Sequence, residues 1–461
     1  MLLKNILKNL PEVASPKEKR LSFNTKLKWT LIVLVIFFVL ANIPLYGLAK
    51  NALDRFQYLA IILGTDFGSI ISLGIGPIVM ASIILQLLVG SKILDIDLKD
   101  EEGKKYFQGL QKLMVFFFVI FEALVYVLMK GLEALPGYSF IVILQLILGG
   151  LAIVFMDELV SKYGFGSGVS LFIAAGVGWR LFAGMFQFLS TQGSNCLFDF
   201  ANTPCAGKVL VLIQSIVNQT PQEALKAFAI LLVTAIIFLI IVWAQSLKIE
   251  VPLSFDRLRG FPLKWPLSFF YTSVIPVILT AALSANFQLV ARLVENWLGR
   301  PTFLGTFSQG RAIGGLAFWI SSTDLLESAI TGSLRYVYIL QALGHVLFYV
   351  FFCTIFALFW VKTSGTDAEG QAKNILSSGL QIPGFRKDER VLEAVLSRYV
   401  TPLTIMGGMA IGFLAAIADL LGSLISGTAI LLAVMIMYQF YQSIAQQHAI
   451  DMHPALKKMI G

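Results

Sequence analysis

The chain has 461 residues, of which 57% are hydrophobic and only 13% are charged, and its formal net charge is +8. Ordinary globular domains are about half apolar and about a quarter charged, so this composition excludes a water-soluble enzyme and indicates a membrane protein. With 3 histidines and 3 cysteines in the whole chain, a metal centre built from these residues is also excluded.

Ten segments are apolar and long enough to cross a bilayer, whose core of about 30 Å takes about 20 helical residues. They lie at about 28–49, 70–90, 109–130, 138–158, 168–189, 222–247, 267–291, 334–361, 399–418 and 422–444. The first is too long for a signal-peptide core and lacks a small-residue cleavage site, so we expect it to be retained. The predicted fold class is an all-α polytopic membrane protein with ten transmembrane helices.

The second span is entered through a break. Residues 54–68 form a semi-polar segment too short to cross a bilayer alone, and Gly74, Gly76 and Pro77 then interrupt the chain before the apolar run. Irregular backbone at membrane depth is tolerated only where it lines a cavity or is buried in protein. The sequence therefore predicts a re-entrant half-helix beside a pathway through the membrane.

Lysine and arginine are concentrated in the N-terminal segment and in the loops at 91–112, 247–266 and 361–400. By the positive-inside rule these segments face the cytoplasm, so we expect both termini there and the protein in the plasma membrane.

Five spans lie on each side of a long outer loop, and an odd number per half makes the halves run in opposite directions. No convincing residue-level repeat relates the halves, so this symmetry is inferred from topology alone. The expected organisation is an N-terminal segment 1–27, a first half 28–190, an outer linker 191–221, a second half 222–446 and a tail 447–461.

No phosphate-binding loop or nucleophile elbow is present, so we expect neither enzymatic activity nor a cofactor. Glu122 and His345 fall inside spans, where ionisable groups often mark a relay, but a hydrogen-bonded structural carboxylate explains Glu122 equally well. Cys353 is interpreted as a small buried thiol within the eighth span.

Two cytoplasmic loops carry basic side chains suited to phosphate backbones or acidic proteins. The candidates for docking are Arg257, Arg259, Arg386 and Lys387. Simple topology determinants are the alternative, although about 40 residues between the eighth and ninth spans exceed what topology needs.

Cys196 and Cys205 both lie in the outer loop, on the side where disulfides persist. Gly193 and Asn202 are among the turn residues that let the two Cα atoms approach each other. We expect a disulfide, with two free thiols as the alternative.

Short motifs along nearly the whole chain resemble the SecY family of protein-conducting channels. They are most similar to the sequences of its archaeal branch. They include Leu10-Pro11-Glu12-Val13, Gly74-Ile75-Gly76-Pro77, Phe107 to Lys112, Asp157-Glu158, Ser161 to Gly164, Gly166-Ser167-Gly168, Ile275 to Ile278, Gly384 to Lys387 and Gly427-Thr428. The resemblance implies two inverted five-helix halves around a narrow waist.

Carried over by position, the waist is a ring of aliphatic side chains. Its members would be Ile75, Val79, Val169, Ile173, Ile278 and Leu432. A narrow apolar constriction holds back hydrated ions because it dewets, whereas on the plainer interpretation each residue is ordinary core.

The resemblance also implies a plug and a lateral gate. The plug is the segment at about 54–68, with polar residues Asp54, Arg55, Gln57, Thr65 and Asp66. The gate lies between the second and third spans and the seventh and eighth, with Gln111 and Asn286 as its polar residues. Met80 occupies a gate position that is often Ser or Thr in the family.

The implied partners are two small single-span subunits of the SecE type and the beta or SecG type, a ribosome or a cytosolic motor ATPase, signal sequences, nascent polypeptides and membrane lipid. The main alternative is a ten-span secondary transporter with inverted repeats. It should show charged or unwound ligands at the midplane of both halves, whereas only the second span is clearly broken.

Overall fold

The structure is a computed structural model of the chain, and it describes residues 10–18, 21–48, 68–90, 93–94, 96, 101–128, 132–188, 196, 203–255, 262–270, 274–308, 311–377, 380–381 and 388–452. Each of the ten predicted spans falls on a helix. They are α2 (Phe23–Ala41), α4 (Gly76–Gly90), α5 (Glu101–Leu128), α6 (Ser139–Tyr163), α7 (Gly168–Phe186), α9 (Pro221–Ser246), α10 (Ile275–Leu298), α13 (Tyr336–Thr363), α15 (Glu389–Leu420) and α16 (Gly427–Met452).

Within the described residues, nine of these helices are long and apolar enough to cross a membrane, and α4 is a shorter apolar helix. The predicted fold class is confirmed.

Shorter elements connect the spans. They are α8 (Lys208–Val217), α11 (Leu316–Ile320), α12 (Leu325–Ile330), α14 (Ala368–Ser377), β1 (Lys248–Phe255), β2 (Pro262–Ser268), β3 (Thr306–Ser308), β4 (Arg311–Gly314) and β5 (Leu380–Gln381). Strands β1 and β2 pair antiparallel from Lys248–Ser268 to Ser254–Pro262, and β5 pairs with the end of β1. The loop at 247–266, predicted only as basic, is therefore a hairpin continuing from α9.

Several predicted span boundaries are wrong by eight residues or more, and two of them have a visible cause. The seventh span was expected from residue 267, but α10 begins at Ile275, since Leu267 and Ser268 end strand β2 and Phe269 and Phe270 form a turn. The ninth was expected from residue 399, but α15 begins at Glu389. Its extra turns place Leu392 and Leu396 at i and i+4, where they pack with Ile375 of α14 in a small separate core.

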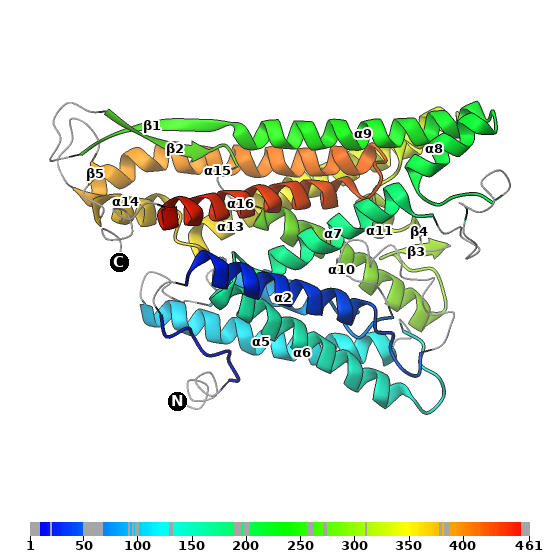
Figure 1. Cartoon of the computed structure of the whole chain (residues 1–461), viewed down its shortest axis with the longest axis horizontal. Helices are drawn as coiled ribbons and strands as arrows, with labels where there is room; N and C mark the ends of the chain where they lie inside the picture. The colour runs from blue at the N-terminus through cyan, green and yellow to red at the C-terminus, as the bar shows by residue number, and fades with distance from the viewer. Residues whose placement is uncertain are drawn as a thin grey trace.

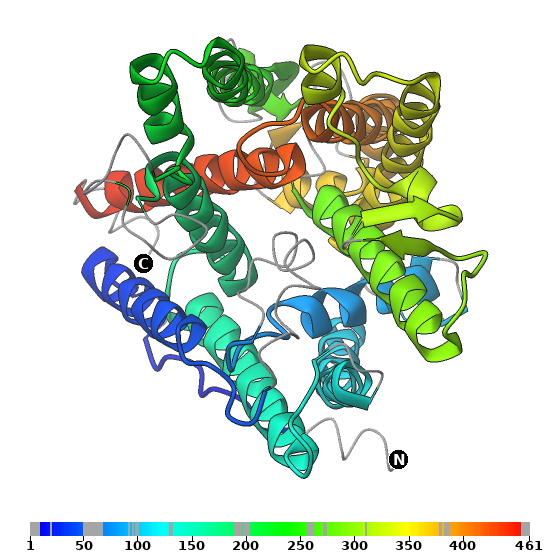
Figure 2. The same cartoon turned by 90° about the vertical axis from the view of Figure 1, so that its right-hand side faces the viewer.

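The spans form a bundle in which α2, α5 and α6 lie on one side and α9, α13, α15 and α16 on the other (Figure 1). Seen along the bundle, α7 and α10 lie between these groups (Figure 2). The start of α2 and the end of α16 meet at one end, where the rings of Phe23 and His448 are 5.7 Å apart. We call this end the terminal face, and the opposite end, with α8, β3 and β4, the linker face.

The predicted break before α4 is present. Gly74 has φ +53°, which favours glycine, and α4 starts at Gly76. The preceding irregular residues are buried and hydrogen-bonded: Ile70 N–H donates to Ile43 O at 3.0 Å, and Gly68 N–H donates to Ser72 Oγ at 2.8 Å. The half-helix predicted at 54–68 lies almost entirely outside the described residues.

The main hydrophobic core joins the two halves. Its buried members come from α2, α4, α6 and α7 of the first half and from α9, α10, α13, α15 and α16 of the second. A second core lies within the first half and includes the linker-face part of α10. Helix α10 is thus surrounded by protein along most of its length, which explains why its buried residues are not confined to one stripe.

Candidate functional site

The six residues predicted to form the waist belong to one hydrophobic cluster. Ile75, Val79, Ile173 and Leu432 are buried members of this cluster, and Val169 and Ile278 are half-buried residues packed against it. They come from the start of α4, from α7, from α10 and from α16, so both halves contribute. This cluster is the main core described above, and within it Ile173 of the first half and Leu432 of the second line the same cavity.

Five of the six residues line one of two cavities. A cavity of about 520 Å³ between α4, α5, α10 and α13 is lined by Val79, Val169 and Ile278. A much smaller cavity of about 30 Å³ is lined by Ile173 and Leu432. Branched aliphatic side chains that meet in a narrow constriction can seal a pathway to ions, because water leaves a narrow apolar neck.

The larger cavity is also the place where the two halves face each other through α4 and α5 on one side and α10 and α13 on the other. Its wall includes Gln111, and Gln111 Nε2 donates to Ser82 Oγ at 2.7 Å. Ser82 in turn donates to Ile78 O of its own helix at 2.8 Å. The Gln111–Ser82 bond therefore ties α5 to α4.

Ser82 was missed by the sequence reasoning, which looked for a polar group at Met80. Ser82 and Gln86 are four residues apart on α4 and both line the larger cavity. This polar stripe on an otherwise apolar helix was the available signal. Asn286 donates to Ala282 O of its own helix at 2.8 Å. Within the part of the chain that the structure describes, no hydrogen bond joins Asn286 to Gln111.

The ionisable residues inside spans occupy separate places. The Glu122 carboxylate lies against the start of α4, where a Cβ on Gly76 would be 3.0 Å from Glu122 Oε2. His345 lies in α13, with Nδ1 2.6 Å from Ile320 O and Nε2 3.6 Å from Asp419 Oδ2. Neither residue lies in the predicted ring.

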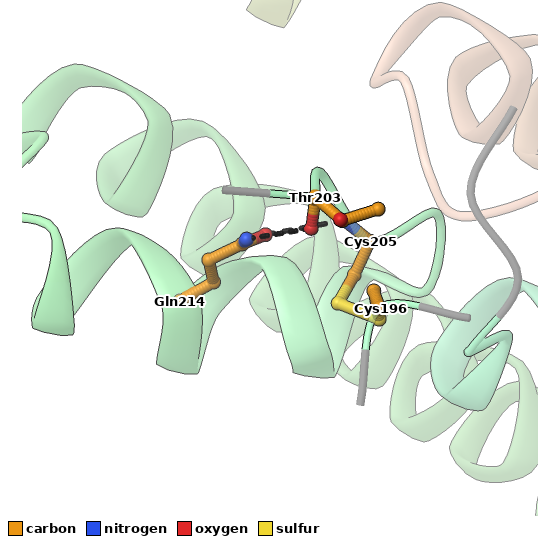
Figure 3. Close-up of a disulfide and its surroundings, with 4 residues drawn as sticks. All are labelled: Cys196, Thr203, Cys205 and Gln214. Atoms are coloured by element: carbon orange, nitrogen blue, oxygen red, sulfur yellow. Dashed lines mark hydrogen bonds between the residues drawn. A yellow bond between two sulfur atoms is a disulfide. The ribbon is translucent and has the colours of Figure 1, made fainter. Parts of the chain in front are cut away.

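On the linker face, Cys196 and Cys205 are joined by a disulfide with Cα atoms 5.3 Å apart (Figure 3). The Gln214 side chain, from α8, holds the same loop: its Oε1 accepts from Cys205 N–H at 3.1 Å and its Nε2 donates to Thr203 O at 2.9 Å. Cys196 N–H donates to Phe188 O at 2.9 Å, just beyond the end of α7. The linker is thereby fixed to both α7 and α8.

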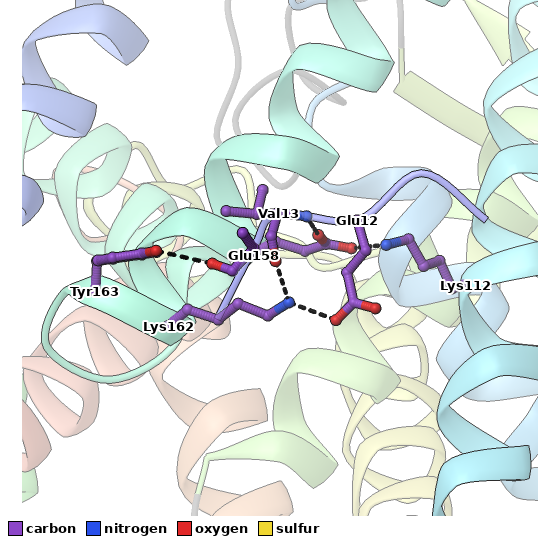
Figure 4. A network of polar contacts seen from close by, with 7 residues as sticks. Glu12, Val13, Lys112, Glu158, Lys162 and Tyr163 are labelled. Atoms are coloured by element: carbon purple, nitrogen blue, oxygen red, sulfur yellow. Dashed lines mark hydrogen bonds and ion pairs between the residues drawn. The ribbon is translucent and has the colours of Figure 1, made fainter. Parts of the chain in front are cut away.

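On the terminal face, residues 10–14 run across the ends of α5 and α6 and are held by a polar network (Figure 4). We call this segment the N-terminal strap. Glu158 pairs with Lys112 and accepts from Val13 N–H at 2.9 Å. Lys162 pairs with Glu12 and also donates to Val13 O.

The Tyr163 hydroxyl completes this network by donating to Ala14 O at 2.8 Å. The hydrogen bond from Lys162, assisted by its charge, holds the pKa of Glu12 below its usual range.

Two predicted sets lie outside the described residues. These are the plug residues Asp54, Arg55, Gln57, Thr65 and Asp66 and the docking residues Arg257, Arg259, Arg386 and Lys387. What the structure does describe is the scaffold for the second set, since β1, β2 and β5 form one sheet and Arg257 and Arg259 lie in sequence between β1 and β2.

Two five-helix halves that share one apolar core, with a cavity between α4 and α5 of the first half and α10 and α13 of the second, have the architecture of a membrane channel rather than of a carrier with charged midplane ligands. The comparisons with known proteins agree. The SecY family model matches residues 69–441, and the model of the plug domain of Sec61p matches residues 35–68. The chain belongs to the SecY family.

Relatives match over nearly the full length. The protein translocase subunit SecY of Methanothermobacter thermautotrophicus is 44% identical over 457 residues, covering 98% of this chain and 97% of that protein. SecY of Methanocaldococcus jannaschii is 39% identical over 457 residues, covering 99% and 98%.

Solved structures are similar as well. A protein-conducting channel superposes with a TM-score of 0.83 at 36% identity, covering 98% of this chain and 99% of the other. Sec61 in the canine ribosome–channel complex from the endoplasmic reticulum gives 0.79 at 36% identity with the same coverage.

Proposed function

We propose that this chain is the pore-forming subunit of a protein translocation channel. It passes secretory polypeptides across the membrane and releases membrane-protein helices sideways into lipid. The observation that supports the proposal is that all six predicted ring residues lie in the core shared by both halves, and that five of them line one of two cavities. Branched aliphatic side chains can yield to a passing chain and close again behind it, because they offer no fixed polar contacts.

The ring is tested by removing two of its members from different helices. Ile278→Gly together with Leu432→Gly should let ions leak through the resting channel in reconstituted vesicles, because the dry neck becomes wide enough to hold water. The matched control is Leu239→Gly with Leu347→Gly, which removes similar volume from exposed positions on α9 and α13. Intact ion tightness in the ring variant would contradict the proposed pore.

The lateral exit is proposed at the seam of α4 and α5 against α10 and α13. The 520 Å³ cavity there supports it, since it is lined by Gln111 and Ser82 on one side and by Ile275 and Trp360 on the other. An apolar signal helix entering this seam would replace contacts between the halves. Asn286, on α10, is proposed as a second polar residue of this gate, and the segment at 54–68 as the plug.

The driving force is proposed to come from partners, with no enzymatic activity in the chain itself. A relative's structure is described as Sec61 in a ribosome–channel complex, which supports a ribosome as the partner, with a cytosolic motor ATPase as the alternative. Two single-span subunits would complete the complex. The protein is proposed to lie in the plasma membrane with its terminal face in the cytoplasm. Most lysines and arginines lie in the N-terminal segment and the loops on that face, as the positive-inside rule requires of the cytoplasmic side.

Docking is proposed through Arg257, Arg259, Arg386 and Lys387, which would contact rRNA phosphates. Changing these residues to Glu should weaken ribosome binding and flatten its salt dependence, since fewer counterions are released. Arg311→Glu, on the opposite face in β4, is the control. An unchanged affinity across a salt series would contradict this docking site.

A further inference from the structure

Two helices that carry ring residues, one in each half, begin in the same way. Helix α7 starts at Gly168, within Ser167-Gly168-Val169, and α16 starts at Gly427, within Ser426-Gly427-Thr428. Each follows the end of the helix before it, α6 for the first and α15 for the second. The two starts share only Ser-Gly followed by a β-branched residue, which explains why no repeat between the halves was visible in the sequence.

A buried carboxylate from the preceding helix holds each start. Val169 N–H donates to Asp157 Oδ1 at 2.9 Å, and Thr428 N–H donates to Asp419 Oδ1 at 2.7 Å. The Thr428 hydroxyl adds a further bond to Asp419 Oδ2. The first amides of a helix have no partner within the helix and carry partial positive charge. A carboxylate is therefore well suited to hold them.

The glycine in each start allows the two helices to touch. A Cβ on Gly168 would lie 2.5 Å from Asp157 Cα, and a Cβ on Gly427 would lie 2.0 Å from the Ala418 carbonyl carbon. Both distances are far shorter than a van der Waals contact. The atoms concerned belong to the main chain, so a rotamer change cannot relieve the clash. Each helix start is thus pressed directly against the backbone beside its capping aspartate.

Val169 is itself a predicted ring residue, and a further ring residue follows one turn after each capped residue. Ile173 is four positions after Val169, and Leu432 is four positions after Thr428, so each lies on the same side of its helix as the capped residue. Ile173 and Leu432 line the same small cavity of about 30 Å³, and the wall of this cavity also includes Asp419. The depth of each ring side chain is therefore set by a bond one helical turn away.

We propose that Asp157 and Asp419 are equivalent positioning residues, one in each half, which set the height of Ile173 and Leu432 in the ring. Asp157 lies near the terminal-face end of α6, and Asp419 lies near the linker-face end of α15. The two helix pairs therefore hold the ring from opposite faces of the membrane. The environments of the two aspartates differ, since His345 Nε2 lies 3.6 Å from Asp419 Oδ2.

This inference rests on the proposed pore, and the experiment separates the two. Resting complexes carrying Asp157→Ala or Asp419→Ala are reconstituted in vesicles, and ion efflux is measured per inserted channel beside the Ile278→Gly/Leu432→Gly variant. The alanine variants should leak several-fold more than the unmodified protein. If the glycine variant is tight, the proposed pore fails. If it leaks and both alanine variants are tight, the positioning role fails.

A matched control separates positioning from general stability. Glu295 accepts from Phe307 N–H through both carboxylate oxygens, at 3.1 and 3.0 Å, away from the ring. Glu295→Ala also removes carboxylate–amide bonds, so it should lower the thermal unfolding temperature without opening the pore. A leak from Glu295→Ala equal to that of the aspartate variants would overturn the specific role.

Conservative variants keep the inference testable if alanine prevents assembly. Asparagine keeps the acceptor oxygen at the same reach, whereas glutamate keeps the charge but is one methylene longer and displaces the helix start. We expect Asp157→Asn and Asp419→Asn to stay nearly tight and Asp157→Glu and Asp419→Glu to leak several-fold. The reverse order would show that charge, not reach, matters, and would overturn the proposal.

Discussion

The linker face and the terminal face fix irregular segments to helix ends by different bonds. On the linker face, the loop at Cys196 is closed by a disulfide and held by Gln214. On the terminal face, the N-terminal strap is held by ion pairs and by hydrogen bonds to its backbone. The contrast matches the proposed orientation, since disulfides persist outside the cell, whereas thiols stay reduced in the cytosol.

The two kinds of attachment should respond to opposite conditions. A covalent bond is insensitive to salt but is lost to a reductant. Ion pairs at a surface are weakened by salt and are unaffected by a reductant. A reductant should therefore break the attachment on the linker face while the strap on the terminal face serves as the internal control. Added salt should do the reverse.

The largest effect is expected from the disulfide. Cys196→Ser with Cys205→Ser should cost about 2–3 kcal/mol of local stability by the chain-entropy account. Amide exchange should rise in α8, while the strap stays protected. Intact mass before and after reduction, with Cys353 as the one thiol expected to stay free, checks the bond. Alkylation of both linker thiols in the native, unreduced protein would contradict it.

A smaller loss is expected from Glu158→Ala, which removes both the partner of Lys112 and the acceptor of Val13 N–H. The Lys112 and Glu158 side chains are only 15% and 18% exposed, so the expected loss is about 1–3 kcal/mol, typical of hydrogen bonds to charged groups. Exchange at the Val13 amide should accelerate. Lys373→Ala is the control, because its pair with Glu369 is solvent-exposed.

Swapping the charges sharpens that test. Lys112→Glu with Glu158→Lys should restore the ion pair but not the acceptor for Val13, so exchange at this amide should remain fast. Full recovery of protection would show that the ion pair alone holds the strap.

Tyr163→Phe should have a still smaller effect, because one neutral hydrogen bond to Ala14 O contributes about 0.5–1.5 kcal/mol. Its effect should be the same at low and high salt, unlike that of Glu158→Ala. Salt dependence of the phenylalanine variant would indicate that Tyr163 acts through the ion pairs instead.

The smallest effect is a pH dependence from Glu12. The pKa of Glu12 is held below its usual range by the Lys162 hydrogen bond. Its contribution is therefore present above the usual carboxylate range and is lost as pH falls through the lowered folded-state value. Protection of the strap should decline at acid pH, and less so in Glu12→Gln. Identical acid profiles would exclude Glu12 as the source.

Hydropathy was enough to predict all ten spans, because crossing a bilayer demands a long apolar helix whatever the tertiary structure. It failed where apolar residues serve another purpose. Leu267 and the residues before it belong to a strand, and Leu392 and Leu396 bury a helix extension against α14. Such boundaries depend on neighbours that hydropathy does not identify.

For the candidate site, the sequence supplied the ring positions but not the bonds that join the helices. The family resemblance supplied the six ring positions, all of which fall in the main hydrophobic core, and their role as a ring stays a prediction. The Gln111–Ser82 bond and the caps by Asp157 and Asp419 join different helices. A side chain that bonds across helices carries no periodic signal, so only the packed structure reveals its partner.

Helix α4 has a consequence for how the protein itself is assembled. Its 15 residues span only about 22 Å at about 1.5 Å per residue, short of the roughly 30 Å hydrocarbon core. The rest of the crossing is irregular backbone, covered by α6 so closely that a Cβ on Gly149 would lie 1.9 Å from Ile70 O. Such a segment cannot enter lipid on its own, since its polar groups need a protein cover. We therefore expect the second crossing to be completed only after the fourth has been synthesised, so that the order of membrane integration differs from the order of translation.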